Sequence, residues 1–243
     1  MMKRGFAGLV FVGAALLAAQ PARAGLIEEM VLLERAYVPA LGITNQAGKD
    51  AQSREAMRRL SSAWARFLEN TRAEAKQDAA LAGALGEAGG SIAKASATLE
   101  RGGSLADAHD ALEGVRATLW KWRAARGIDY FPDRLTAYHD AMEHLADLAT
   151  SASPDEARLR QALTEAGARW ARVESAPFDA ALFGFPPDKA ARMKGLIAKE
   201  RALLAELQAL AGADRERRAG AVKTMKGTFA QIYFLFGDFD GLQ

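Results

Sequence analysis

Apolar residues recur at spacings of three and four along almost the whole chain of 243 residues. This spacing lines up apolar side chains on one face of an α-helix, whereas a half-buried strand would show strict alternation. The chain is rich in Ala, Leu, Glu and Arg, and runs of β-branched residues are few, which also favours helix. We therefore expect an all-α fold without a strand pair. The pattern predicts eight helices, near residues 27–45, 53–73, 76–100, 104–126, 132–150, 154–175, 187–211 and 214–236.

Several of these helices have recognisable ends. Ser104 begins a capping pattern, and Ser153–Glu156 is a capping box with Pro at the first helical position. Gly127 is placed to end the helix that starts near Ser104, and Pro132 begins the next one.

The first 24 residues have the three parts of a secretory signal peptide. Basic residues come first, an apolar run extends from Phe6 to Ala19, and Ala22 and Ala24 supply a small-residue cleavage signal. The apolar run is shorter than the about 20 residues that a membrane-spanning helix needs. We expect cleavage after Ala24, export to a bacterial periplasm and no stable membrane anchor in the mature protein.

Removal of this leader changes the net charge. The leader carries Lys3, Arg4 and Arg23 of the chain's 32 basic residues, which leaves 29 against 30 acidic ones and a net charge of −1. A nearly neutral mature chain gives no electrostatic reason to expect nucleic acid or anionic lipid as a partner.

Missing residue types exclude several classes of function. The chain has no Cys, which excludes disulfides, thiolate metal sites, a Cys nucleophile and covalently attached haem. The signatures of zinc proteases, of serine hydrolases, of P-loop proteins and of dinucleotide-binding proteins are also missing. We therefore do not expect an enzyme.

A weak internal duplication divides the helices into two sets of four. Trp64 and Trp170 stand at matching places, and all matching segments follow in the same order. The duplication predicts a signal peptide at residues 1–24 and two tandem, related four-helix up-down units at residues 25–127 and 128–243. The matches are Ala36-Tyr37 with Ala137-Tyr138, Ala63–Arg66 with Arg169–Arg172, Ala108 and Gly114 with Ala221 and Gly227, and Gly127–Tyr130 with Gly237–Phe239.

A second repeat accounts for all three His of the chain, because two lie inside its copies and the third directly follows the second copy. The pattern L-x-x-x-H-D-A-[LM]-E occurs at Leu105–Glu113 and again at Leu135–Glu143, with His144 directly after it. A His and a Glu four residues apart share a helix face, which is a spacing of metal ligands in bundle proteins. The candidate ligands for Zn, Fe, Cu or Mn are His109, Glu113, His139, Glu143 and His144.

Helix geometry favours a structural role for the same residues. His139 lies about 80° from the centre of the apolar stripe of its helix and His144 about 140°, so His144 should point outward. In an antiparallel hairpin, His109 would lie about 25 Å from the turn and His139 about 10 Å, so they could not share one ion. Each His would then bridge core and solvent beside a local acid. A site with one motif and ligands from another helix, such as Glu28, Glu29 or Glu34, stays open.

Aromatic residues supply a second candidate site. Trp64, Trp120, Tyr138, Trp170 and Tyr233 fall at equivalent or adjoining places of the two predicted units. Aromatic residues on apolar helix faces are ordinarily core, and the alternative is a ligand pocket between helices.

The last helix of each unit has a distinctive outline. In the second unit, Gly227 precedes Phe229, Ile232 and Tyr233, and in the first unit Gly114 precedes Arg116, Leu119 and Trp120. This outline resembles the last helix of cytochrome c′-type bundles, with these residues in place of the two haem-linking Cys and the axial His. Because every haem-attaching position differs, the resemblance implies a bundle and not the redox function. The segment from Tyr130 to Glu143 also resembles uncharacterised exported helical proteins of bacteria, which implies no activity.

These observations predict a non-enzymatic periplasmic binding or accessory protein that handles a metal ion through the paired motifs. One alternative is a bundle that binds haem or another apolar ligand without a covalent bond, for electron transfer. Another is a scaffold that binds a partner protein through the face carrying the two motifs. The identity of the ligand, metal or partner does not follow from the sequence.

Overall fold

The computed structural model describes residues 20–210 and 212–242, and within these residues the chain forms nine α-helices and no strand. The prediction of an all-α fold is confirmed. A helix that the sequence did not predict, α3, falls at the expected connection near residues 73–76. The helices are α1 (Gln20–Thr44), α2 (Asp50–Asn70), α3 (Arg72–Gln77), α4 (Ala79–Glu100), α5 (Leu105–Ala125), α6 (Phe131–Thr150), α7 (Glu156–Ser175), α8 (Pro187–Ala209) and α9 (Arg215–Phe234).

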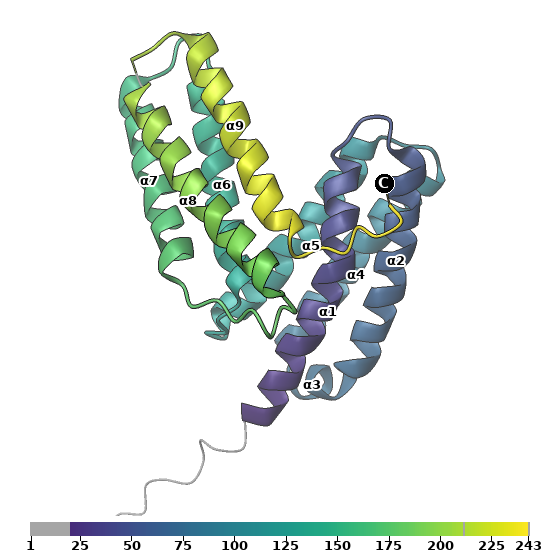
Figure 1. The fold of residues 1–243 in the computed structure, drawn as a ribbon. Coiled ribbons are helices and arrows are strands. Elements are labelled where there is room, and N and C mark those ends of the chain that lie inside the picture. Colours follow the sequence, from purple (N-terminus) through teal and green to yellow (C-terminus); the bar gives the residue numbers. More distant parts are fainter. Residues whose placement is uncertain (1–19, 211, 243) are drawn as a thin grey trace, which may run out of the picture.

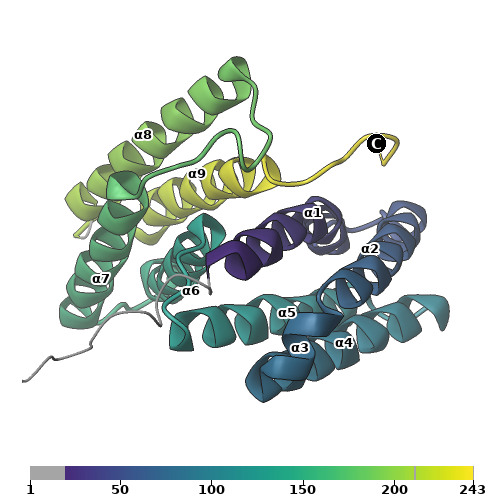
Figure 2. The same cartoon turned by 90° about the horizontal axis from the view of Figure 1, so that it is seen from below.

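The helices gather in two groups (Figure 1). In the first group, α1 packs on α2, α2 on α4, α4 on α5 and α5 on α1. In the second group, α6 packs on α7, α7 on α8, α8 on α9 and α9 on α6. The groups meet where α1 contacts α9 and where α5 contacts α6. Figure 2 shows α1 on the side of the first group that faces the second. The origin of the groups by duplication stays a prediction.

Local capping explains where several helices begin and end. The Ser104 hydroxyl accepts a hydrogen bond from the Ala106 amide, as its capping pattern predicts. The box at Ser153 is wrong by two residues, because the Asp155 carboxylate accepts from the Ala157 and Arg158 amides and α7 begins after it. A carboxylate at this place also interacts favourably with the helix dipole. Gly127 ends α5 with a φ of 62°, which Gly adopts without steric cost.

Buried apolar side chains form one connected core that runs through both groups. Val38 and Leu60 are fully buried in the first group, and Leu145 and Ile232 are fully buried in the second. The helices of both groups are therefore held by apolar packing, and polar side chains inside the molecule need a separate explanation.

The segment after α9, Gly237–Leu242, leaves the second group and lies along the first (Figure 1). We call it the C-terminal strap. The Asp238 amide donates to the Arg35 carbonyl at 2.8 Å, and Arg59 Nη1 donates to the Asp240 carbonyl at 2.6 Å. Leu242 is buried. The strap therefore adds a third connection between the two groups.

Most of the predicted signal peptide lies outside the described residues. Among the helices that are described, none is both long and apolar enough to cross a bilayer.

Candidate functional site

Both histidine motifs line one pocket of about 120 Å³ at the place where the two groups meet. We call it the junction pocket. Helices from both groups build it, because α1 and α5 belong to the first group and α6 and α9 to the second. The polar lining residues are Asn45, His109, Glu113, Arg116, His139, Glu143, Lys226 and Tyr233, and the apolar side includes Leu41, Met142, Phe229 and Phe234.

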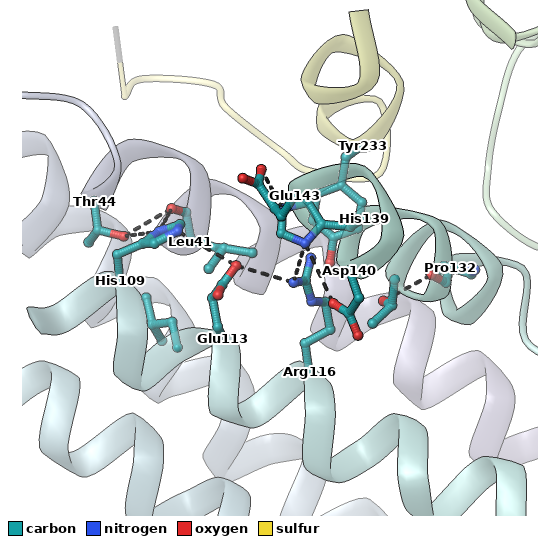
Figure 3. A network of polar contacts seen from close by, with 12 residues as sticks. Leu41, Thr44, His109, Glu113, Arg116, Pro132, His139, Asp140, Glu143 and Tyr233 are labelled. Carbon is teal, nitrogen blue, oxygen red and sulfur yellow. Dashed lines mark hydrogen bonds and ion pairs between the residues drawn. The ribbon is translucent and has the colours of Figure 1, made fainter. Parts of the chain in front are cut away.

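The two imidazoles stand at different positions along the axis of α5. Arg116 is the residue of α5 that faces His139, and it lies seven positions after His109, or about 10 Å along the helix. Figure 3 shows His109 beside Thr44 and His139 beside Arg116. Each imidazole is close to the Glu of its own motif, at 3.8 Å for His109 and Glu113 and at 3.6 Å for His139 and Glu143.

Hydrogen bonds assign a proton to a definite nitrogen of His109. Its Nδ1 lies 2.9 Å from the Leu41 carbonyl, and a carbonyl can only accept, so Nδ1 carries the hydrogen. In the neutral imidazole, Nε2 is then a free acceptor that faces Glu113. His109 therefore offers a lone pair to the pocket.

His139 has the opposite arrangement. Arg116 Nη2 lies 3.0 Å from its Nδ1, and a guanidinium can only donate, so Nδ1 accepts and Nε2 carries the hydrogen in the neutral ring. The ring also packs on Phe229, with centroids 5.5 Å apart. His139 therefore offers a donor to the pocket where His109 offers an acceptor.

Two cations inside the pocket neutralise its two carboxylates. Arg116 is buried and its Nη2 lies 3.2 Å from Glu113 Oε1, while Lys226 Nζ lies 2.7 Å from Glu143 Oε2. Arg116 Nε has no hydrogen-bond partner among the described residues. A guanidinium thus stands between Glu113 and His139, where the predicted metal ion would need to be. In the described part of the chain, no three His, Asp or Glu side chains are grouped to hold a metal.

A second polar cluster lies deeper, beside the junction pocket. A cavity of about 20 Å³, enough for about one water, shares Arg116 and Tyr233 with the pocket. The Tyr233 hydroxyl donates to Glu34 Oε1 at 3.1 Å, and the Tyr130 hydroxyl donates to Glu34 Oε2 at 3.4 Å. Burial raises the pKa of Glu34, and the positive charge of Arg123 opposes this effect. Glu34 therefore joins α1 to the second group through two tyrosines.

The remaining predicted ligands lie elsewhere. His144 is exposed on α6, in the outward direction that helix geometry predicts. Glu29 accepts a hydrogen bond from Asn70 Nδ2 at 3.0 Å, and Glu28 lines a separate surface pocket near Gly127. Glu34 belongs to the deeper cluster. None of these residues lines the junction pocket.

The structure distributes the five predicted aromatic residues over several places, because most of them fill the core. Tyr138 and Trp170 pack on each other inside the second group, with ring centroids 4.5 Å apart. Trp64 packs on Phe67 inside the first group. Trp120 lines a different surface pocket, and Tyr233 lines the junction pocket. Core packing of Tyr138, Trp170 and Trp64 agrees with the ordinary role of aromatic residues on apolar helix faces, and a ligand pocket formed by all five stays a prediction.

Two cations of the junction pocket, Arg116 and Lys226, are not among the site residues that the sequence predicts. Arg116 follows His109 and Glu113 at spacings of seven and three, so the helical period places all three on one face of α5. That spacing could have identified it. Lys226 is on α9, far along the chain, and no local pattern connects it with either motif.

Comparisons with protein-family models, with curated proteins and with solved structures found no significant match. The function of this chain must therefore be inferred from its own residues.

Proposed function

We propose that this chain is a binding protein, and that its junction pocket takes a small zwitterionic organic molecule of about the size of an α-amino acid. The observation that carries the proposal is the presence of two ion pairs on the polar side of one small pocket. They are Glu113 with Arg116 and Glu143 with Lys226. Phe229, Phe234 and Met142 on the other side would receive an apolar side chain.

Charge balance supports a ligand with no net charge. With neutral imidazoles, Arg116 and Lys226 offset Glu113 and Glu143. A ligand carboxylate would pair with Lys226, and a ligand ammonium would pair with Glu113 and the free Nε2 of His109. With such a ligand the pocket keeps a net charge of zero, whereas a purely anionic or cationic ligand would leave one charge in excess.

Pocket size supports a small ligand. The junction pocket encloses about 120 Å³. Pockets for drug-sized molecules enclose roughly 300–1,000 Å³, and a haem needs a long slot. The volume therefore favours an amino acid over the haem alternative. No Ser or Thr is among the described residues that line the pocket, which favours binding over nucleophilic catalysis.

Isothermal titration of the purified protein with glycine, alanine, leucine and glutamate tests the proposal. We expect at least one of these probes to bind, and Lys226→Gln to weaken its binding about tenfold, since one charge-assisted hydrogen bond is lost. The matched control is Lys223→Gln, an exposed lysine of the same helix that does not line the pocket. Absence of binding by all four probes, or equal affinity in K226Q and wild type, would overturn the proposal.

Metal binding is a second candidate, and one hydrogen bond favours it. An imidazole that ligates a metal commonly donates its other N–H to a backbone carbonyl, as His109 Nδ1 does to Leu41. The metal would have to displace Arg116 from Glu113. Metal analysis of the same protein after incubation with Zn²⁺ or Mn²⁺ separates the candidates. A stoichiometric metal that is lost in His109→Ala and kept in His144→Ala would favour this one.

We also propose that the binding function is periplasmic, because residues 1–24 carry the pattern of a cleavable leader. The N-terminal residue of protein recovered from the periplasm should be Gly25. An uncleaved N-terminus would count against export by this route.

A further inference from the structure

A second and larger cleft lies between α1, α2 and the C-terminal strap. It encloses about 430 Å³ and shares no lining residue with the junction pocket. Four guanidinium groups line it, from Arg35 on α1 and from Arg58, Arg59 and Arg66 on α2. We call it the arginine cleft. It took no part in the proposed function.

The positive charge of this cleft is only partly neutralised. Arg58 and Arg59 both pair with Glu55, and Arg59 also donates to the Asp240 carbonyl of the strap. Among the described residues, Arg35 and Arg66 make no side-chain hydrogen bond and no ion pair. Glu55 and Asp238 are the acidic residues of the lining. The four arginines therefore exceed the carboxylates by two charges.

Another cation lies close to the same place. Burial lowers the pKa of Lys189 on α8, and the neighbouring positive charge of Arg35 lowers it further, while Asp238 and Asp188 oppose the shift. Like charges that are held together by a fold destabilise each other until a counterion is bound. The concentration of positive charge around Arg35 is therefore a place where an anion would be stabilised.

We propose that the arginine cleft binds a compact dianion whose negative charges lie on oxygen atoms, either a phosphate monoester or a dicarboxylate. The planar fork of a guanidinium matches the oxygens of carboxylate and phosphate, and Arg35 and Arg66 have their forks free for such a contact. Two excess charges match a dianion. The volume lies within the range of about 300–1,000 Å³ that is usual for small-molecule sites, which favours a small ligand over an extended polymer.

The position of the strap gives this binding a structural consequence. Asp238 and Leu242 of the strap line the cleft together with residues of α1 and α2. Since the strap continues from α9, a ligand in the cleft would contact the first group and the chain that leaves the second. An anion that binds here should therefore raise the melting temperature of the protein.

Titration with inorganic phosphate and with succinate, against sodium chloride of matched ionic strength, tests the proposal by calorimetry and by thermal unfolding. We expect binding and a higher melting temperature with at least one of the two probes. The double variant Arg35→Gln/Arg66→Gln should weaken binding about tenfold or more. Because both side chains are exposed, the variant should still fold.

The matched control is Arg158→Gln/Arg160→Gln, which removes two exposed arginines from α7 and leaves the cleft intact. It should bind like the wild type. Binding of inorganic phosphate alone would assign a phosphate group as the recognised anion, and binding of succinate alone a dicarboxylate. A response no greater than that to chloride, or equal binding by R35Q/R66Q, would overturn the proposal. The double variant R35Q/R66Q leaves every lining residue of the junction pocket intact, so this test is independent of that pocket.

Discussion

Glu200 on α8 is a carboxyl group with no exposed surface. The Tyr138 hydroxyl donates to its Oε1 at 2.7 Å, whereas its Oε2 has no partner among the described residues. Burial raises the pKa of Glu200 to about 7, although the hydrogen bond from Tyr138 opposes the rise. At the residue scale, this single group should make the stability of the protein depend on pH near neutrality.

The sign of this dependence follows from the two pKa values. The folded state holds the proton up to about pH 7, whereas the unfolded chain releases it near 4.5. The contribution of Glu200 to the free energy of unfolding is therefore fully present below pH 4.5, and it is lost as the pH rises through 7. The difference in pKa corresponds to about 3 kcal/mol. Urea unfolding of wild type and Glu200→Gln at pH 5 and pH 8 measures it, and the variant should lose the contribution of this group.

Glu206→Gln is the control for this comparison, because Glu206 is exposed on the same helix. It should keep the wild-type dependence on pH. A fall in stability between pH 5 and pH 8 that is as large in E200Q as in wild type would show that Glu200 does not titrate in this range.

The candidate site could be predicted in part from single residues. His109 with Glu113 and His139 with Glu143 line the junction pocket, because the helical period puts each pair on one face. The cations that neutralise them could not be found in the same way. Lys226 reaches Glu143 across 83 positions of sequence, and Tyr233 reaches Glu34 across 199. Such contacts depend on the packing of helices, which the local pattern does not specify.

At the scale of elements, local sequence patterns predict where the helices lie, but they do not predict which helices pack against each other. Apolar spacing predicts where α5, α6 and α9 lie, and Ser104 and Gly127 mark two of their ends correctly. The short α3 was not predicted, because its six residues bury no side chain and leave no apolar period. The packing of α9 on α1 has no local signal either. It depends on Gly42 of α1, because a Cβ atom there would clash with the ring of Phe234 of α9.

Gly237, at the start of the C-terminal strap, also lies close against α1. A Cβ atom on it would lie 2.8 Å from the ring of Phe239 and 2.9 Å from Pro39 and Val38 of α1. These distances are shorter than real contacts, and Val38 and Pro39 are buried. Gly237→Ala should therefore destabilise the protein by about 1–3 kcal/mol, as overpacking does. Thermal and urea unfolding followed by circular dichroism would measure this loss.

Gly220→Ala on α9 is the matched substitution. A Cβ atom there meets no atom within 4 Å, and Ala in a helix is more favourable than Gly by about 0.5–1 kcal/mol. G220A should thus stabilise the protein while G237A destabilises it. A gain in stability for both would mean that the strap moves away from α1 without cost.

At the scale of the whole molecule, the two helix groups meet through polar as well as apolar contacts. Arg123 of α5 and Asp133 of α6 form a buried ion pair, with Nε to Oδ2 at 2.8 Å and Nη2 to Oδ1 at 2.5 Å. The guanidinium of Arg123 also lies over the ring of Tyr130, at 4.7 Å from its centroid. The same surface carries Glu34 and the junction pocket. Packing of the two groups therefore positions the candidate site.

A double-mutant cycle on Arg123 and Asp133 would measure how much this ion pair contributes. Arg123→Met alone leaves the Asp133 carboxylate buried without its partner. Asp133→Leu alone leaves the Arg123 guanidinium buried without its partner. Each single substitution should cost about 3–5 kcal/mol. The double variant R123M/D133L should recover most of that loss, because apolar side chains can replace a buried ion pair with little net change.

Differential scanning calorimetry of the four proteins adds a second readout. In R123M and D133L, weaker contact between α5 and α6 should separate the unfolding of the two groups into two transitions, and one transition should return in R123M/D133L. Losses below about 1 kcal/mol in both single variants would contradict a desolvated pair. Additive losses in the double variant would show that the two side chains act independently. The junction of the groups would then depend on its apolar contacts and on Glu34.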